Sequence, residues 1–167
     1  MARLKPLPKV WLVSDTRNDA VLSSTLKAMP RGSGFIFRHY HLEPAERRAR
    51  FAVLARLARA RGHIVVLAGS CSLARQWGAD LAYGASGDLV PVHSLREIGR
   101  AKQAAAVLLS PAFPTRSHPG GKPLGPVRFR LLAARAKVPV IALGGMNTRS
   151  VKRLGWPRWA GIDAFLR

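Results

Sequence analysis

The sequence predicts an α/β protein, a closed (β/α)8 barrel shortened by about two helices. Short apolar runs alternate with amphipathic stretches along the whole chain. The apolar runs are continuous rather than alternating, which is typical of parallel strands buried on both faces by helices. The pattern contains about eight strands and five or six helices, a count that suits a closed barrel better than an open sheet.

The element boundaries follow from apolar periodicity and from capping residues. We expect strands at 10–15, 34–42, 63–69, 81–85, 88–94, 105–110, 138–145 and near 161–166. We expect helices at 18–29, 44–61, 72–78, 94–103, 127–137 and 147–155, with Asn18 as the candidate N-cap of the first. Too little chain separates the fourth strand from the fifth for a crossover helix. No helix is expected after the last strand.

Length and composition predict a single domain over residues 1–167. With 48% hydrophobic and 22% charged residues, the chain has the composition of a folded protein. No apolar run reaches the roughly 18 residues of a membrane helix, and the basic start resembles no signal peptide. The single cysteine, Cys71, excludes an internal disulfide framework. We therefore expect a cytoplasmic protein that does not bind a membrane.

The charge is strongly positive, with 28 Lys and Arg against 8 Asp and Glu, a formal net charge of +20. Such a field attracts polyanions and phosphorylated small molecules. Six arginines (47, 48, 50, 56, 59 and 61) lie on the predicted helix 44–61, whose buried stripe is Phe51, Leu54, Ala55 and Ala58. A solvated arginine face is the simpler interpretation. A nucleic-acid partner stays open as an alternative, although no aromatic platform accompanies the arginines.

Two predicted strand ends carry residues suited to phosphate, and strand ends are where βα proteins bind ligands. The Pro- and Gly-rich loop 111–126 brings hydroxyls and cations together, namely Thr115, Ser117, Arg116 and Lys122. The strand 138–145 ends in Gly144-Gly145, directly before a helix opened by Asn147. Glycines before a helix allow backbone N–H groups to approach an anion. A tight βα turn is the alternative explanation for the two glycines.

Three histidines near strand ends allow more than one interpretation. His39 and His41 would face the same way on a strand, which permits a metal ion, although an exposed strand exit is simpler. His93 precedes a predicted helix, where it fits either a neighbour of the N-cap or a base in the site.

The order of these motifs resembles the thiamine phosphate synthase family and its paralogue, the thiazole tautomerase. The likeness runs from about residue 10 to 166 and is most specific in SPAFPTRSHPGGKPLG (110–125) followed by PVIALGGM (139–146). The resemblance implies a TIM barrel acting as a transferase in thiamine biosynthesis. Such an enzyme joins hydroxymethylpyrimidine diphosphate to a thiazole phosphate and releases pyrophosphate with Mg2+.

The resemblance also implies roles for individual residues. Arg38 matches the arginine that holds the diphosphate, and Asp88 matches one of two magnesium aspartates. Thr115 and Ser117 match hydroxyls at the thiazole partner, and Gly145 matches the glycine that binds its phosphate. The catalytic candidates are thus Arg38, Thr115 and Ser117. The substrate- and phosphate-binding candidates are Arg38, Tyr40, His93, Thr115, Arg116, Ser117, His118, Lys122, Gly144 and Gly145.

The sequence departs from the family at several of these positions. Ala68-Gly69 replaces the family's Asn-Asp at diphosphate and metal, and Tyr40 and His118 each replace a lysine. Pro111 replaces the histidine of the tautomerase. A single aspartate makes a poor magnesium site. A paralogue that binds a small phosphate without turnover is therefore the main alternative to a synthase, and a homo-oligomer stays open.

Overall fold

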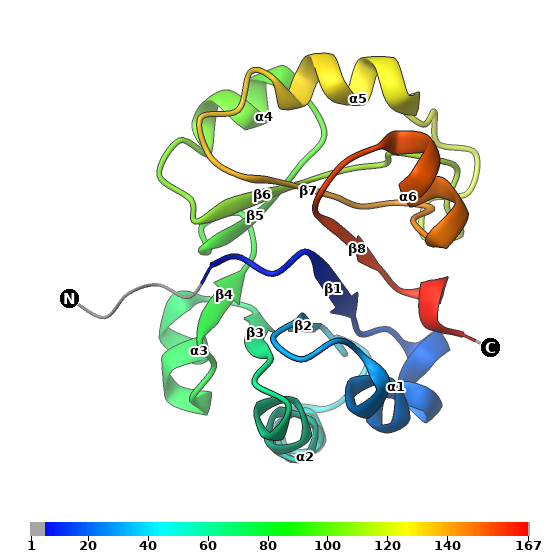
Figure 1. Cartoon of the computed structure of the whole chain (residues 1–167). Coiled ribbons are helices and arrows are strands. Elements are labelled where there is room, and N and C mark those ends of the chain that lie inside the picture. The colour runs from blue at the N-terminus through cyan, green and yellow to red at the C-terminus, as the bar shows by residue number, and fades with distance from the viewer. Residues whose placement is uncertain (1–5, 167) are drawn as a thin grey trace.

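Eight parallel strands close into a barrel in the order β1 to β8 in the computed structural model, which describes residues 6–166 (Figure 1). The strands are β1 (Val10–Val13), β2 (Gly34–Phe37), β3 (Ile64–Ala68), β4 (Leu81–Tyr83), β5 (Leu89–Val92), β6 (Ala106–Leu109), β7 (Val140–Ala142) and β8 (Trp159–Gly161). The predicted barrel is confirmed. Residues 1–5, which contain part of the basic start, and Arg167 lie outside the described residues, and the single-domain assignment stays a prediction.

Helices follow seven of the eight strands in this part of the chain. They are a 3-10 helix (Thr16–Val21) continuing into α1 (Leu22–Ala28), then α2 (Pro44–Ala60), α3 (Cys71–Trp77), α4 (Leu95–Arg100), α5 (Gly125–Ala133), α6 (Thr148–Leu154) and a short 3-10 turn (Asp163–Phe165). The predicted absence of a helix between β4 and β5 is confirmed. None of the helices in residues 6–166 combines the length and apolar character that a bilayer-spanning segment requires.

A five-residue loop, residues 84–88, joins β4 directly to β5. The Asp88 carboxylate accepts a hydrogen bond from the Ala82 N–H at 2.8 Å, and the Asp88 N–H donates to the Ala82 carbonyl at 2.9 Å. The Gly84 N–H donates to the Leu89 carbonyl at 3.0 Å. These bonds let β5 start beside the end of β4, where Tyr83 pairs with Leu89. Asp88 therefore closes this turn.

The predicted strands are longer than the observed ones, most clearly β2, which ends at Phe37 instead of residue 42, and two further boundaries are misplaced. Asp15 caps the first helical segment, and Asn18 is the third residue of the turn, where its side chain accepts from the Asp15 N–H at 2.8 Å. The last strand lies at Trp159–Gly161 instead of 161–166, and Asp163 follows it on the 3-10 turn. The first error arises because the short polar side chain of Asp15 caps the turn directly after β1. The second arises because the apolar run 161–166 belongs mostly to the 3-10 turn and not to the strand.

The core has three parts, one inside the barrel and two beneath the helices. Trp11, Ile36, Val66, Leu108 and Ile141 fill the barrel interior with their neighbours on alternate strand positions. Strands β1 to β4 pack against α1 to α3, where the predicted stripe of α2 is buried, and β5 to β7 pack against α4 to α6. The molecule therefore has two helical lobes around one barrel (Figure 1).

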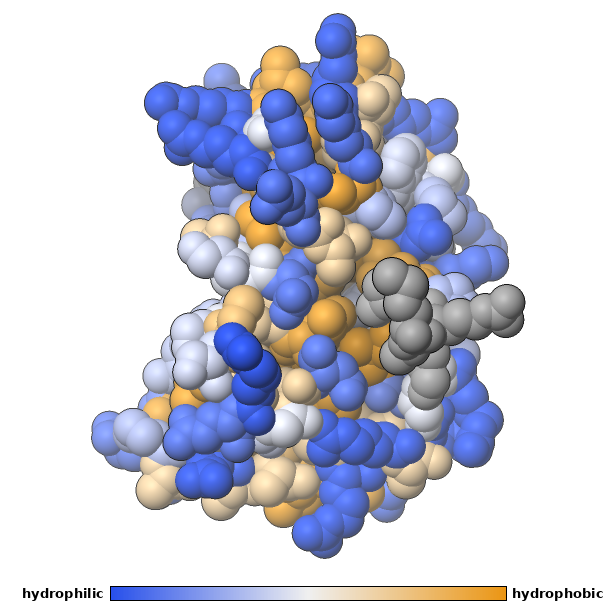
Figure 2. Space-filling model, turned by 90° about the vertical axis from the view of Figure 1, so that its left-hand side faces the viewer, coloured by the Kyte–Doolittle hydropathy of each residue, from blue (hydrophilic) through white to orange (hydrophobic). Residues whose placement is uncertain are grey.

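On the face that carries α3, β4 and α4, the two lobes differ in surface hydropathy from the band between them. Hydrophilic side chains predominate on both lobes, although each also shows some apolar surface, and apolar surface is also visible in the band between them (Figure 2). This band lies at the height where β4 passes into β5 without a covering helix (Figure 1). The shortened connection thus leaves part of the barrel without its usual helical cover.

Trp11 and Gly34 form the tightest packing in the barrel interior. The two residues pair across β1 and β2, and a Cβ at Gly34 would lie 1.9 Å from the Trp11 ring. We expect Gly34→Ala to lower the free energy of unfolding by about 3 kcal/mol through overpacking. Urea denaturation measures it. Gly99→Ala is the matched control, since nothing lies near its Cβ on α4, and we expect it to stabilise by about 0.5 kcal/mol. Equal changes in the free energy of unfolding for the two substitutions would contradict the close packing of Trp11 on Gly34.

Candidate functional site

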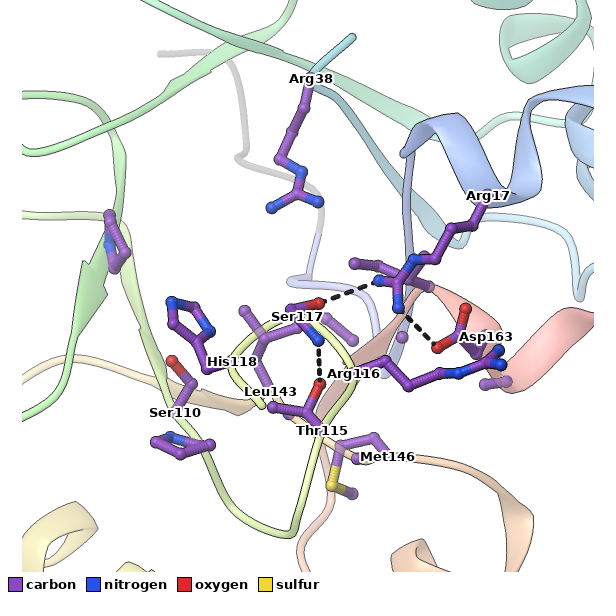
Figure 3. Close-up of a pocket in the computed structure, with 18 of the residues that line it drawn as sticks. Arg17, Arg38, Ser110, Thr115, Arg116, Ser117, His118, Leu143, Met146 and Asp163 are labelled. Carbon is purple, nitrogen blue, oxygen red and sulfur yellow. Dashed lines mark hydrogen bonds and ion pairs between the residues drawn. The ribbon is translucent and has the colours of Figure 1, made fainter. Parts of the chain in front are cut away.

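A pocket of about 550 Å³ opens at the carboxyl ends of the strands (Figure 3). Its wall comes from the ends of β4 and β5 and from the segments that follow β1, β2, β6, β7 and β8. Nine of the predicted site residues line it: Arg38, Tyr40, His93, Thr115, Arg116, Ser117, His118, Gly144 and Gly145. Lys122 and Asp88 are not among the lining residues. The structure thus brings together the two segments that sequence analysis paired, the loop around Thr115 and Gly144-Gly145.

The loop after β6 packs directly on the turn after β7. The Ala112 N–H donates to the Leu143 carbonyl at 2.8 Å, and the Phe113 N–H donates to the Gly144 carbonyl at 3.0 Å. Gly144 and Gly145 have φ angles of 95° and 62°. A Cβ at Gly145 would lie 2.4 Å from the Pro114 carbonyl oxygen. Only glycine fits both the backbone conformation and the close contact.

The turn after β7 lines the pocket with residues whose backbone N–H groups are free to bind a ligand. Gly144, Gly145 and Met146 line it, and their N–H groups donate no hydrogen bond within residues 6–166. In α6, the N–H groups of Arg149 and Ser150 are not available, because the Asn147 side chain accepts from both, each at 3.0 Å. The N–H groups that could bind an anion here therefore belong mainly to the glycine turn.

Arg17 is a pocket residue that sequence analysis missed. Its guanidinium lies between two carboxylates, 3.1 Å from Asp15 and 3.1 Å from Asp163, and it also donates to the Ser117 hydroxyl at 2.9 Å (Figure 3). Its position two residues after the strand-end Asp15 was a usable signal. Asp163 was hidden because the last strand was predicted to run through it. Arg17 connects the ends of β1 and β8 to the loop after β6.

Residues at the end of β1 orient the Arg38 side chain. Its Nε donates to the Ser14 carbonyl at 3.1 Å, and NH2 lies 2.7 Å from the Asp15 carboxylate. Partial burial alone would raise the pKa of Asp15, but hydrogen bonds from Arg17 and the charges of Arg17 and Arg38 outweigh it and hold the pKa below its ordinary value. Asp15 is thus an ionised anchor for both arginines.

His39 and His41 lie beyond the end of β2; His41 is exposed, but His39 is buried, so the prediction of an exposed strand exit is wrong for His39. Its ring is 1% exposed and stacks on Phe37, and its φ is 42°. Nδ1 lies 2.8 Å from the Ser14 hydroxyl, and Nε2 lies 2.7 Å from the Asp19 carboxylate. Because the Asp19 carboxylate only accepts hydrogen bonds, Nε2 carries the ring proton, and Nδ1 of the neutral ring accepts from the Ser14 hydroxyl, which itself accepts the Arg38 N–H at 2.8 Å. This series of hydrogen bonds, from Asp19 through His39 and Ser14, fixes the backbone position of Arg38.

Tyr40 and Arg47 close the outer side of the β2 end. Tyr40 is 66% exposed, and the Arg47 guanidinium lies 5.4 Å from its ring centroid. Arg47 donates to the carbonyls of Arg38 and Ala68, at 2.8 and 2.7 Å. Burial lowers the pKa of Arg47. Arg47 thereby holds the ends of β2 and β3 together where the family's Asn-Asp is replaced.

His93 and Tyr83 face the pocket from its other side. His93 Nδ1 lies 3.0 Å from the Ser110 carbonyl and 3.1 Å from its hydroxyl. The N-cap of α4 is Ser94, with Glu97 completing the capping box, so His93 is a neighbour of the cap that also lines the pocket. Burial raises the pKa of Tyr83, which keeps the phenol neutral as a hydrogen-bond donor.

The carboxylates around the pocket do not form a site that fits Mg2+. Asp88 is hydrogen-bonded to the β4 backbone, and Asp15 and Asp163 are each paired with arginine. Gly69 stands at the end of β3 with a φ of 149°. Residues 6–166 contain no cluster of three or more His, Cys, Asp or Glu side chains that could hold a metal ion. His39 and His41 instead bond to Asp19 and Thr16.

The fold and the pocket define a (β/α)8-barrel protein with a cationic pocket at the strand ends. Residues 84–163 match the family model described as thiamine monophosphate synthase, the family that the sequence resembles. Over 79 residues the chain is 35% identical to a protein of Aquifex aeolicus (strain VF5) named "Putative thiamine-phosphate synthase 2".

That match covers 44% of this chain and 42% of the Aquifex protein, so it spans less than half of the curated relative. The solved thiamine phosphate pyrophosphorylase from Pyrococcus furiosus has the same fold, with a TM-score of 0.78. It is 19% identical, and the alignment covers 93% of this chain and 86% of that one. The structural likeness therefore extends beyond the part where the sequence likeness is measurable.

The burial of His39 and His63 predicts that the fold becomes less stable at acidic pH. Burial lowers the pKa of both rings, for His39 against the opposing effect of Asp19. The unfolded chain therefore binds protons first, and stability present above about pH 6.5 is lost as the pH falls from there to the folded-state pKa. We expect the free energy of unfolding in urea to be lower at pH 5.5 than at pH 7.5. His39→Asn, which tolerates the positive φ, should reduce this difference. An unchanged difference would contradict the assignment.

Proposed function

We propose that this protein acts in thiamine biosynthesis as a thiamine phosphate synthase-like transferase. Its pocket binds a thiazole phosphate and couples it to hydroxymethylpyrimidine diphosphate. The thiazole nitrogen attacks the methylene carbon of the pyrimidine, the bond from that carbon to the diphosphate oxygen breaks, and its electron pair leaves with pyrophosphate.

One observation carries this proposal: the convergence of the glycine turn and the Thr115 loop on one pocket. Three backbone N–H groups without partners in residues 6–166 lie beside hydroxyl and guanidinium groups. Successive free N–H groups on a positive-φ turn form a concave site for an anion. A phosphate monoester is the ligand that satisfies such donors at one end of a pocket.

Each side chain has a definable part in this reaction. Gly144, Gly145 and Met146 bind the thiazole phosphate through their N–H groups, and Thr115 orients it. Arg38, on the opposite wall, binds the diphosphate and stabilises the charge that develops on it as it leaves. Tyr83 and Pro91 also line the pocket, and their bulk limits access of water to the reacting carbon.

A binding protein without turnover is the second candidate. It is favoured by Gly69, which stands where the family has a carboxylate, and by Asp88, whose carboxylate is bonded to the Ala82 N–H. Such a protein would keep the phosphate cradle and lack the coupling reaction.

The two candidates separate in one pair of measurements. Thiamine phosphate formation is followed with both precursors, in MgCl2 and in EDTA, and calorimetry follows thiazole phosphate alone. We expect thiazole phosphate to bind and product to form. Binding without product would select the second candidate, and no binding would contradict both.

Substitutions in the cradle test its location. We expect Gly145→Asp to abolish thiazole-phosphate binding, because its side chain enters the space of the Pro114 carbonyl and adds a negative charge. Thr115→Ala should weaken binding about tenfold through loss of one hydrogen bond to a charged group. Calorimetry measures both. Gly99→Asp is the matched control, since it adds the same charge on α4 in open space. Normal binding by Gly145→Asp would place the site elsewhere.

A further inference from the structure

We infer that this pocket binds a diphosphate group directly through arginines, with Arg17 taking the electrostatic part that a divalent cation would otherwise have. The inference deepens the proposed function and rests on it, because it concerns the diphosphate end of the same pocket. It assigns a ligand-binding part to Arg17, which neither the sequence motifs nor the family resemblance singled out.

The geometry around Arg17 is the first argument. Its guanidinium bridges the Asp15 and Asp163 carboxylates, each at 3.1 Å. A cation between two carboxylates is the arrangement in which proteins hold a divalent metal. Here the chain itself supplies the cation. The Asp163 oxygen that does not face Arg17 is enclosed by protein, so it offers no ligand to an ion in the pocket.

The donors left over are the second argument. A guanidinium has five N–H groups. Arg17 uses three of them, toward Asp15, Asp163 and Ser117, which leaves two. Arg38 uses two, toward Ser14 and Asp15, which leaves three. Arg116 is exposed at the rim and its side chain makes no hydrogen bond within residues 6–166. The free donors are enough for several diphosphate oxygens.

A second hollow beside the pocket is the third argument. It measures about 540 Å³ and is lined in part by the ends of β1 and β2. The two hollows share six wall residues: Arg17, Arg38, Tyr40, Arg116, Ser117 and His118. An anion in either hollow therefore contacts the same cationic wall. A group with two linked phosphates fits this arrangement better than a single phosphate, which the glycine turn alone can bind.

Calorimetry with inorganic pyrophosphate tests the inference on the full chain. We expect binding in EDTA, with MgCl2 failing to tighten it by more than about twofold. Arg17→Ala and Arg116→Ala should each weaken binding in EDTA by about tenfold or more, the effect of losing a charge-assisted contact. Arg56→Ala is the matched control: it removes the same charge from the exposed face of α2 and should bind as the parent does. Thermal unfolding of each variant separates a loss of binding from a loss of fold.

Three outcomes would overturn the inference. One is pyrophosphate binding that requires MgCl2 or tightens tenfold with it. Another is normal binding by both Arg17→Ala and Arg116→Ala. The third is an equal loss in Arg56→Ala, which would assign binding to the general +20 field. Thiazole phosphate is titrated in parallel: if it binds while pyrophosphate fails in EDTA, only this inference fails, and if neither binds, the proposed function fails as well.

Discussion

The close packing of the β6 loop on the β7 turn is the constraint on which the rest of the site depends. At Gly145 the distance from a Cβ position to the Pro114 oxygen is too short for any side chain. This contact turns the loop around Thr115 over the glycine turn and holds the free N–H groups at the pocket wall. Without it, hydroxyls and amides separated by about 30 residues in sequence would have no common ligand.

The hydrogen-bond and ion-pair network around Arg17 has a second structural effect, which is to attach β8 to the barrel. β7 and β8 share one paired position, Ala142 with Trp159. At the carboxyl end the Asn18 side chain donates to the carbonyls of Val13 and Ile162, at 2.9 and 3.2 Å, and Arg17 binds Asp163. These polar contacts extend the three-position pairing of β8 with β1 beyond Gly161, so β8 is held mainly from its β1 side. The residues that close the barrel therefore also set the charge at the pocket mouth.

Sequence analysis predicted the barrel because continuous apolar strands and a count of eight leave few alternatives. It also paired Thr115 with Gly145, since strand order places neighbouring strand ends side by side. It missed Arg17 and Asp163 because their role depends on a contact between residues 146 apart in the chain. It misjudged His39 because nothing in a local pattern reveals that Ser14 and Asp19 bury its ring. Long-range polar contacts are what the periodicity of one segment does not encode.

The shortened β4–β5 connection explains why Asp88 is not available as a metal ligand. With only five residues between parallel strands, the loop has no room for a helix, and its backbone groups must be satisfied within the turn itself. Asp88 does this by accepting the Ala82 N–H, which removes its carboxylate from the pocket. An aspartate that the family resemblance assigns to magnesium thus becomes a turn residue as a consequence of chain length. A diphosphate in this pocket then needs its positive charge from elsewhere, and the cations nearest to hand are the arginines that close the barrel.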